Sequence, residues 1–408
     1  MPLICFKPGN SGILLALPLV MKTYQFFTAV SFMLFTGVAQ AALNACQLET
    51  APIEAQNISQ EAIEAYRSKL RQECVVYKKY LDLRNYEQQF GVSLEKINLY
   101  QGLRYVDRYA YEKAKPKDIP VELIFQVKRA DADKPISERS SLVWRNWTRG
   151  IEQLSQTKQD IEQGKAIDIP YLQKIHIGFF AEDESSENGD VLHPGELKNG
   201  IYPSVSWNLD ADKIEPYTAV AKKIDDNLKA LDLRPQLVAE EDYVNKLVDV
   251  REGMLYPAAP RAVKAHVTNM LKFLNAMMAQ ARENKPMIYK DHLYTPMQVA
   301  YFIQQYIVQI HGFHDGNGRI SRFWQDVVLA VFDLPAGASG DLNYNDMTAD
   351  EAEYYHRSLA KGFNELLDVE KCFTDVYPKL LPQNWKEQGL SVRSIDSSRI
   401  PYDCRFLK

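Results

Sequence analysis

Apolar residues recur at helical spacing along most of this chain. Residues 50–112 alternate charged and apolar positions with few helix-breaking residues, which predicts helix. Residues 171–180 (YLQKIHIGFF) are a second, apolar-rich helix candidate. A third helix is predicted to open at Pro257 and Pro260. It carries an apolar stripe made of Val263, Val267, Met270, Leu271, Leu274 and Met278. The expected fold class is therefore mainly α.

Two strongly apolar helices are predicted on either side of a short polar loop. Thr295 followed by Pro296 is typical of a helix start, with threonine as the N-cap and proline at the first helical position. The apolar stripe that follows is Val299, Phe302, Ile303, Tyr306, Ile307 and Ile310. Residues His311–Arg319 (HGFHDGNGR) interrupt it, and we expect two glycines of this loop to end the helix. A new stripe then predicts a second helix that ends at Leu334-Pro335; its members are Ile320, Phe323, Trp324, Val327, Val328 and Val331.

Between the helices lie segments with loop and strand signals. Residues 121–127 (VELIFQV) predict a strand or a buried run, and residues 181–200 are typical of an acidic loop. Residues 201–207 (IYPSVSW) alternate in polarity and predict one arm of a short hairpin. Residues 215–250 predict one or two helices. A second folded unit is expected to begin between residues 140 and 165.

The first 41 residues differ from the rest of the chain. Met21–Gln25 is short and positively charged, residues 26–38 are apolar, and Ala39–Ala41 is a small-residue A-x-A site. This order is typical of a secretory signal peptide, and the apolar run is too short to span a bilayer comfortably. We expect cleavage near Ala41, a periplasmic or secreted product, and no stable membrane anchor afterwards. The alternatives are a buried apolar helix and a membrane anchor.

Cysteine usage agrees with export. Removal of residues 1–41 leaves four cysteines, Cys46, Cys74, Cys372 and Cys404. An even number in an exported chain allows two disulfides with three connectivities. Pairing Cys46 with Cys74 and Cys372 with Cys404 needs the shortest loops. The alternative is that all four are unpaired small apolar residues.

Composition and charge constrain the class of protein. The 408 residues are 46% hydrophobic and 25% charged, which is typical of a globular protein, and this length favours two folded units after the leader. The formal net charge is -5, and removing the leader with its two lysines leaves 46 basic against 53 acidic side chains. Nucleic-acid binding needs clustered Lys and Arg, so we expect no nucleic-acid partner.

The polar loop contains the residue types that bind phosphate groups. The backbone N–H groups at the start of the following helix, at Gly316, Asn317 and Gly318, suit a diphosphate. Arg319 and Arg322 lie three residues apart on the first turn of that helix and can clamp phosphate oxygens. These five residues are the predicted nucleotide-binding set.

The same loop contains a candidate base and a candidate metal ligand. His311 can take a proton from an attacking hydroxyl near pH 7, and Asp315 is a hard oxygen ligand of the kind that Mg²⁺ prefers. Phe313 is expected to point into the core. The alternatives are a structural histidine, a surface acid, and a zinc site that includes His314. A zinc site would leave the glycines and arginines unexplained, and we expect His314 to face substrate or solvent.

From His311 to Arg322 the chain resembles the signature of the Fic family, H-x-F-x-[D/E]-G-N-G-R-x-x-R, and every defined position matches. Residues 194–198 (PGELK) resemble the family's P-G-x-aromatic-R flap, with Leu197 and Lys198 as departures, and the helix candidate 171–180 resembles the helix before it. The resemblance implies a Fic-type helical bundle with a small β-hairpin flap.

This organisation gives a leader at residues 1–41, a helical N-terminal region of unknown role at 42–140, a Fic domain at 141–370 and a C-terminal extension at 371–408.

Membership of this family would imply protein adenylyltransfer. His311 would deprotonate a Ser, Thr or Tyr hydroxyl of a target protein, which would attack the α-phosphorus of ATP. Pyrophosphate would leave, held by the loop glycines, the arginines and Mg²⁺ on Asp315. The flap would align the target segment by strand addition. ATP and Mg²⁺ are thus the expected donor and metal, and a hydroxyl-bearing protein is the expected partner.

Three hypotheses about the function of the chain remain open. The chain is an exported AMP transferase that acts in another cell or compartment, or a Fic enzyme of altered chemistry (UMP, phosphate or phosphocholine transfer, or removal of AMP). The third hypothesis is a binding protein with an idle site. Glu152 is a weak candidate for an inhibitory glutamate, because residues 148–153 match the family's inhibitory motif except at the last position. The sequence identifies neither target, oligomeric state nor host.

Overall fold

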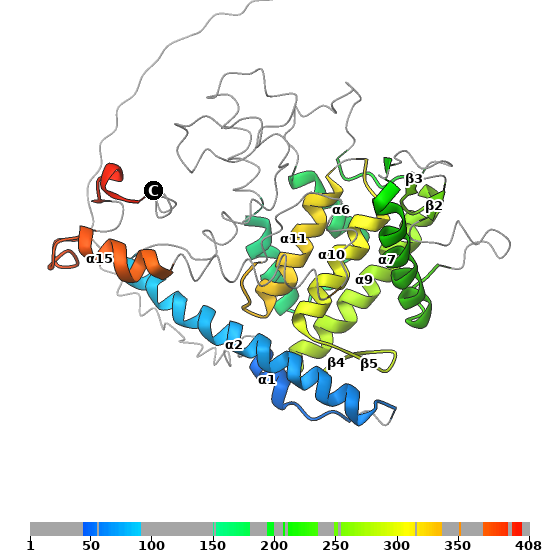
Figure 1. The fold of residues 1–408 in the computed structure, drawn as a ribbon, viewed down its shortest axis with the longest axis horizontal. Coiled ribbons are helices and arrows are strands. Elements are labelled where there is room, and N and C mark those ends of the chain that lie inside the picture. The colour runs from blue at the N-terminus through cyan, green and yellow to red at the C-terminus, as the bar shows by residue number, and fades with distance from the viewer. Residues whose placement is uncertain are drawn as a thin grey trace, which may run out of the picture. The chain divides into compact units, whose positions relative to one another are not determined.

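Helices α10 (Pro296–Ile310) and α11 (Asn317–Val331) are the central pair of the fold in the computed structural model (Figure 1). α9 (Pro260–Arg282) packs against α10, and α6 (Ile169–Gly178) packs against α9. The structure describes residues 44–54, 57–90, 150, 152–179, 194–199, 207–208, 211–235, 249–251, 254–314, 316–336, 351, 370–390 and 394–401. The prediction of a mainly helical fold is confirmed.

The apolar stripes predicted for the central helices form the main core. α11 is buried over almost its whole length, and so is α10 after its first turn. α9 buries one face and exposes the other, as its amphipathic pattern requires. Thr295 caps α10 as predicted, because its side chain accepts a hydrogen bond from the N–H of Gln298 while Gln298 bonds back to the backbone of Thr295.

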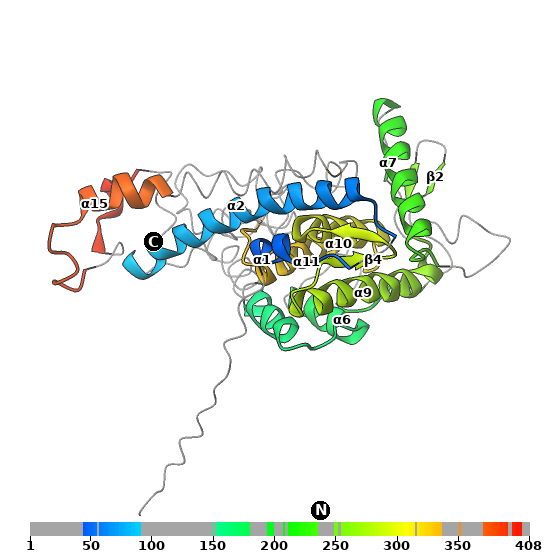
Figure 2. The same cartoon turned by 90° about the horizontal axis from the view of Figure 1, so that it is seen from below.

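The N-terminal region contributes to this same core. α1 (Ala45–Thr50) and the long helix α2 (Gln60–Phe90) lie against each other (Figure 2). Residues of both helices, among them Leu48 and Leu70, belong to the core cluster that contains the central helices. The described residues of the N-terminal helices therefore belong to the same compact unit as the central helices.

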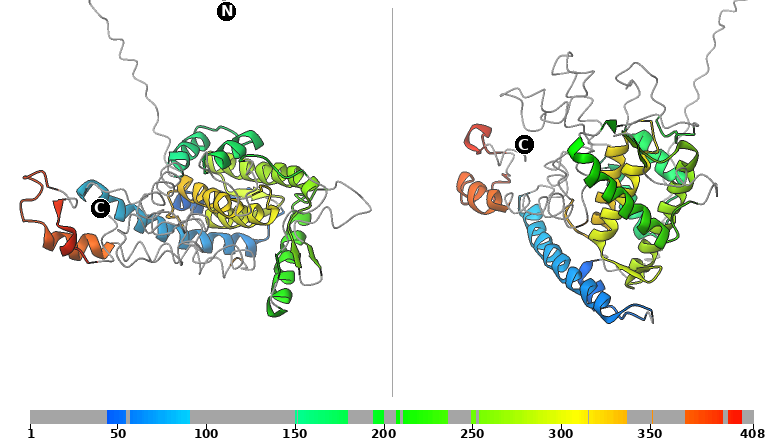
Figure 3. Two further views of the ribbon diagram at one scale, coloured as in Figure 1. Left: turned by 90° about the horizontal axis from the view of Figure 1, so that it is seen from above. Right: turned by 45° about the vertical axis from the view of Figure 1, so that its right-hand side comes forward.

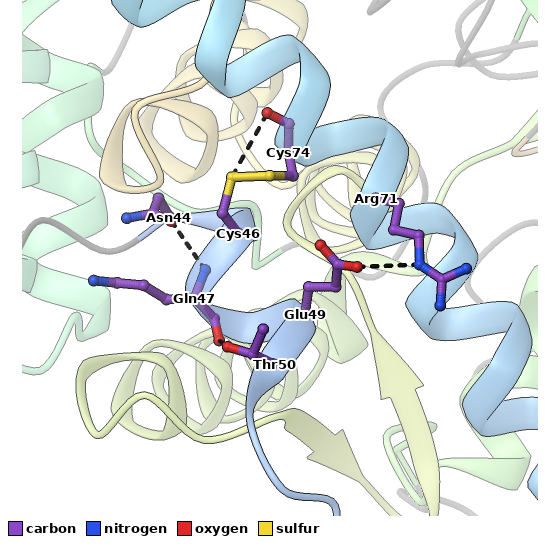
Figure 4. Close-up of a disulfide and its surroundings, with 7 residues drawn as sticks. All are labelled: Asn44, Cys46, Gln47, Glu49, Thr50, Arg71 and Cys74. Atoms are coloured by element: carbon purple, nitrogen blue, oxygen red, sulfur yellow. Dashed lines mark hydrogen bonds and ion pairs between the residues drawn. A yellow bond between two sulfur atoms is a disulfide. The ribbon is translucent and has the colours of Figure 1, made fainter.

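A disulfide joins Cys46 of α1 to Cys74 of α2, with the Cα atoms 4.7 Å apart (Figure 4). An ion pair between Glu49 and Arg71 lies beside it, at 3.1 Å. Of the three connectivities that the sequence left open, the described part of the structure shows the short-loop pairing of Cys46 with Cys74. Cys372 is disulfide-bonded as well, and its predicted partner Cys404 lies outside the described residues.

Glu73 of α2, the residue before Cys74, has a buried carboxyl group that lies at the start of α10. Glu73 is 3% exposed, and its Oε2 accepts a hydrogen bond from the N–H of Met297 at 3.2 Å. The side chain of Thr295 also bonds to it. The N–H groups in the first turn of a helix have no partners within the helix. Glu73 of α2 provides a hydrogen-bond acceptor for one of them in α10. Burial raises the pKa of the Glu73 carboxyl to about 8.

The C-terminal extension packs on the far half of α2. A π-helical turn (Cys372–Val376) leads into α15 (Tyr377–Leu380), and a short 3-10 turn follows at Ser397–Arg399. Figure 3 shows the orange α15 beside the cyan end of α2. The contact between the C-terminal extension and α2 is aromatic. Tyr86 stacks on Phe373 with 5.4 Å between ring centroids, and Phe90 stacks on Trp385 at 5.5 Å.

Two small antiparallel sheets complete the described part of the chain. In the first, β1 (Trp207–Asn208) and β2 (Asp249–Arg251) flank β3 (Met254–Tyr256). The prediction of helix over 215–250 is confirmed by α7 (Ala211–Ala230) and is wrong at its end, where β2 forms. Trp207 lies in a strand as predicted, but its partner is Leu255, which is distant in sequence.

The second sheet is a hairpin that the sequence did not predict. β4 (Met287–Tyr289) and β5 (His292–Tyr294) are joined by Lys290 and Asp291, which both have positive φ, 48° and 61°. Such a turn favours Asn-Gly or Asp-Gly. Because Lys-Asp lacks this signature, the hairpin was missed.

Several predicted features lie outside the described residues: the signal peptide, the strand at 121–127 and most of the acidic loop at 181–200. Among the helices that the structure does describe, none combines the length and apolar character of a membrane span.

The buried position of Glu73 predicts a pH-dependent stability. Its folded-state pKa of about 8 lies above the ordinary glutamate pKa of 4.5, so between these values the native state keeps a proton that the unfolded chain has already lost. The stabilising effect is complete below about pH 4.5 and is lost as the pH rises through about 8. We expect Glu73→Gln to remove this loss, which is on the order of 3 to 5 kcal/mol.

Chemical denaturation of both proteins from pH 5 to 8.5 measures the difference, with Glu64→Gln as the control because Glu64 is exposed on the same helix. Parallel stability curves for wild type and Glu73→Gln would contradict the expectation.

Candidate active site

His311 lies at the C-terminal end of α10 in a left-handed backbone conformation, with φ 46° and ψ 48°. Its N–H still bonds to the carbonyl of Ile307, at 3.2 Å, so the residue is the C-cap of the helix. The expectation that glycines end α10 is therefore wrong: the histidine itself ends it. Non-glycine residues seldom adopt this conformation, and such outliers cluster at functional sites.

Gly312 serves close packing instead. A Cβ atom at this position would lie 3.1 Å from Cγ1 of Val263 and 3.3 Å from Cγ2 of Ile310. The absence of a side chain at residue 312 thus lets the loop after His311 pass close to α9 without crowding Val263.

The side chain of Asn317 closes the loop. Its Oδ1 accepts from the N–H of Phe313 and its Nδ2 donates to the carbonyl of Phe313, each at 2.8 Å. Phe313 is 2% exposed and points into the core, as predicted. The amide of Asn317 therefore replaces the backbone partners that the buried Phe313 would otherwise lack. The sequence assigned Asn317 to the phosphate site through its backbone, and the structure adds this second role.

α11 begins directly after this closed loop. Gly316, with φ 74°, is the N-cap and has no side chain to cap the helix. The first regular bond of the helix runs from the N–H of Ile320 to the carbonyl of Gly316, at 3.0 Å. The helix ends at Val331, before the predicted Leu334-Pro335, because Asp333 turns to a left-handed φ of 51°.

The two arginines of the motif are both buried. Arg319 is 9% exposed, and its Nη1 donates to the carbonyl of Phe179 at the end of α6, 3.2 Å away. Arg322 is 4% exposed. The guanidinium of Arg319 thus links the first turn of α11 to the end of α6.

The predicted flap segment lies along the loop. Leu197 forms an antiparallel bridge with Phe313, and the N–H of Lys198 donates to the carbonyl of Gly312 at 2.7 Å. Lys198 is only 5% exposed. Three positively charged residues therefore lie in the flap segment and in the first two turns of α11: Lys198, Arg319 and Arg322. Arginine and lysine side chains are common binding groups for phosphate oxygens.

Comparison with known proteins identifies the domain. Residues 220–329 match the model of the Fic/DOC family. The chain contains a Fic domain. No curated protein matches the chain, and no solved structure does. The matched range contains the whole motif from His311 to Arg322, whereas the flap segment 194–199 and helix α6 precede it.

Within the Fic domain, the structure brings together most of the predicted site residues. His311, Gly316, Asn317, Gly318, Arg319 and Arg322 all lie in the loop or in the first two turns of α11. Asp315 lies outside the described residues, and His314 is exposed. Glu152 is exposed in the helical residues 152–162, and no contact with the motif is seen for it among the described side chains.

The sequence analysis missed two residues that contact the predicted flap segment. His176 and Gln173 of α6 both hydrogen-bond to Gly195 of the flap. The only sequence signal was a histidine and a glutamine on an apolar-rich helix, which is also typical of residues satisfied within a core.

The two bonds of the Asn317 side chain predict a sharp loss of stability on truncation. Asn317→Ala would leave the buried N–H and carbonyl of Phe313 without these partners, at a cost of about 2 to 4 kcal/mol. Chemical denaturation measures this cost. Ser321→Ala, which removes one side-chain bond to the carbonyl of Gly318, is the matched control and should cost about 1 kcal/mol or less. Equal costs for the two variants would refute the closing role of Asn317.

Proposed function

We propose that this chain is a Fic-type protein adenylyltransferase that transfers AMP from Mg-ATP to a Ser, Thr or Tyr hydroxyl of a target protein. Fic-family proteins generally transfer phosphate-containing groups to proteins. The observation that carries the proposal is the left-handed histidine, which begins a loop that leads directly into the N-terminus of α11 at Gly316. A base and an anion site therefore lie within one short, closed loop.

His311 is the general base of the proposed reaction. It accepts the proton of the target hydroxyl, whose oxygen forms a bond to the α-phosphorus of ATP. The bond between the α-phosphorus and the bridging oxygen breaks, and pyrophosphate leaves. The N–H groups at the start of α11, with Arg319 and Arg322, bind the phosphates and stabilise the charge that develops on the leaving group.

The donor set suits a magnesium ion held mainly by phosphate oxygens and water. The part of the chain that the structure describes holds no group of three or more His, Cys, Asp or Glu side chains suited to a metal. Mg²⁺ bound with a nucleotide commonly uses one or two carboxylates, and the motif offers Asp315 for this. When bound, the ion would neutralise charge on the phosphates.

Replacing the proposed base should abolish transfer without unfolding the protein. We expect His311→Ala and His311→Asn to lose at least 100-fold of the AMP-transfer rate, the scale of general-base catalysis, while still binding Mg-ATP. Asparagine tolerates the left-handed conformation, so it removes the imidazole with little backbone strain. Intact-mass spectrometry after incubation with Mg-ATP and a cell lysate detects an AMP-sized gain.

His292→Ala is the control, because His292 is exposed on β5. Transfer that persists in both His311 variants would exclude His311 as the base. Labelling by another nucleoside triphosphate and not by ATP would exclude AMP as the transferred group.

We also propose that the protein is exported after cleavage near Ala41. The n-region, apolar run and A-x-A site support this, and so does the disulfide between Cys46 and Cys74, because disulfides persist mainly in oxidising compartments. N-terminal sequencing of the exported fraction should give a mature chain that begins at Ala42, and Ala41→Arg should block cleavage. A cell-associated chain that retains residues 26–38 would contradict export.

A further inference from the structure

Gly195 of the flap is held by α6 through both of its backbone groups. Its N–H donates to Nδ1 of His176 at 2.9 Å, and its carbonyl accepts from Nε2 of Gln173 at 2.7 Å. The φ of Gly195 is +86°, and a Cβ atom there would lie 2.7 Å from the side chain of Ile177. The flap thus approaches α6 at a position that only glycine can occupy without strain.

The imidazole of His176 also contacts the motif loop. Its ring stacks on Phe313 with 3.8 Å between centroids and 16° between planes, and each residue is 2% exposed. One ring therefore contacts the flap through a nitrogen and the motif loop through its face. Phe313 is two residues from His311, so this contact lies immediately beside the proposed base.

The flap meets the loop again further along the chain. Leu197 bridges to Phe313, and the N–H of Lys198 bonds to the carbonyl of Gly312 at 2.7 Å. The segment 194–199 is thus fixed at Gly195 by α6 and at Leu197 and Lys198 by the motif loop. His176 is the side chain that takes part in both attachments, since it bonds to Gly195 and supports Phe313.

The bond to Gly195 requires a hydrogen-bond acceptor and not merely a side chain of the right volume. Nδ1 accepts the N–H of Gly195, so the neutral ring carries its proton on Nε2. A phenylalanine would keep an aromatic ring against Phe313 and would leave the buried N–H of Gly195 unsatisfied. An asparagine would keep an acceptor close to the position of Nδ1 and would remove the stacked ring.

We propose that His176 is a positioning residue that fixes the flap relative to His311, so that a target segment paired with the flap presents its hydroxyl to the base. The proposal rests on the function proposed above. A target strand added to the flap inherits the position of the flap backbone. Displacement of the flap would move the hydroxyl away from the base and leave the nucleotide site intact, so water could replace the protein as the acceptor.

The attachment itself is tested without any reaction. Hydrogen exchange of the amide of Gly195 is measured by mass spectrometry on peptides that cover residues 194–199. We expect His176→Phe to accelerate this exchange on the order of tenfold, the scale of one lost hydrogen bond, and His176→Asn to restore much of the protection. Lys174→Ala is the control, because Lys174 is exposed on the same helix.

The positioning role is tested by the fate of AMP. Wild type and variants are incubated with Mg-ATP and a cell lysate, and AMP attached to protein is compared with free AMP. We expect His176→Phe to lower the ratio of attached to free AMP on the order of tenfold while the affinity for Mg-ATP changes less than about twofold. His176→Asn should recover part of the ratio. A merely structural role would lower ATP binding and transfer together.

The two proposals fail in different ways. If the wild type neither transfers nor releases AMP, the proposed function fails, and the exchange experiment still tests the attachment. Unchanged exchange at Gly195 in His176→Phe would overturn the attachment. A His176→Phe variant with faster exchange and an unchanged ratio of attached to free AMP would overturn the positioning role. Gln173→Leu, which removes the bond to the carbonyl of Gly195, provides a second variant if His176→Phe does not fold.

Discussion

The loop between α10 and α11 must satisfy its own backbone groups, because it joins two helices that are buried almost throughout. Asn317 meets this requirement with one side chain that bonds to both backbone groups of Phe313. The closed loop fixes the left-handed turn at His311 relative to the start of α11. A base and the N–H groups of a helix N-terminus thereby keep a constant geometry, which is what a transfer reaction that depends on positioning requires.

Other parts of the protein contact the two central helices at the ends that lie away from this loop. At the far end of α10, Glu73 of α2 bonds to the first turn of the helix. At the far end of α11, Asp333 accepts from Lys158 at 2.8 Å and from Arg84 at 3.2 Å. α2 thus contacts the remote ends of both central helices through Glu73 and Arg84. This gives α2 a structural role in a region for which the sequence suggested none.

Much of the site could be predicted because its signals are local. The capping pattern at Thr295, the apolar stripes on both sides of the loop and the glycines at its end depend on residues a few positions apart. The pairing of Cys46 with Cys74, which lie 28 residues apart, was one of three connectivities that the sequence left open. The hairpin β4–β5 was missed because tertiary packing there accepts Lys290 and Asp291 in a turn that their types do not favour.

The sequence by itself determined the helical class, the central helix pair and the order of the motif residues from His311 to Arg322. These features could be predicted because helical periodicity, helix caps and the residue types of the loop all depend on residues that are close in sequence. Only the tertiary structure decided that His311 ends its own helix, that Arg319 bonds to the end of α6, and that His176 links Gly195 to Phe313. These contacts join segments up to 140 residues apart. Their partners depend on which buried backbone N–H and C=O groups have no helical or strand partner once the helices have packed. A local sequence pattern does not contain this information.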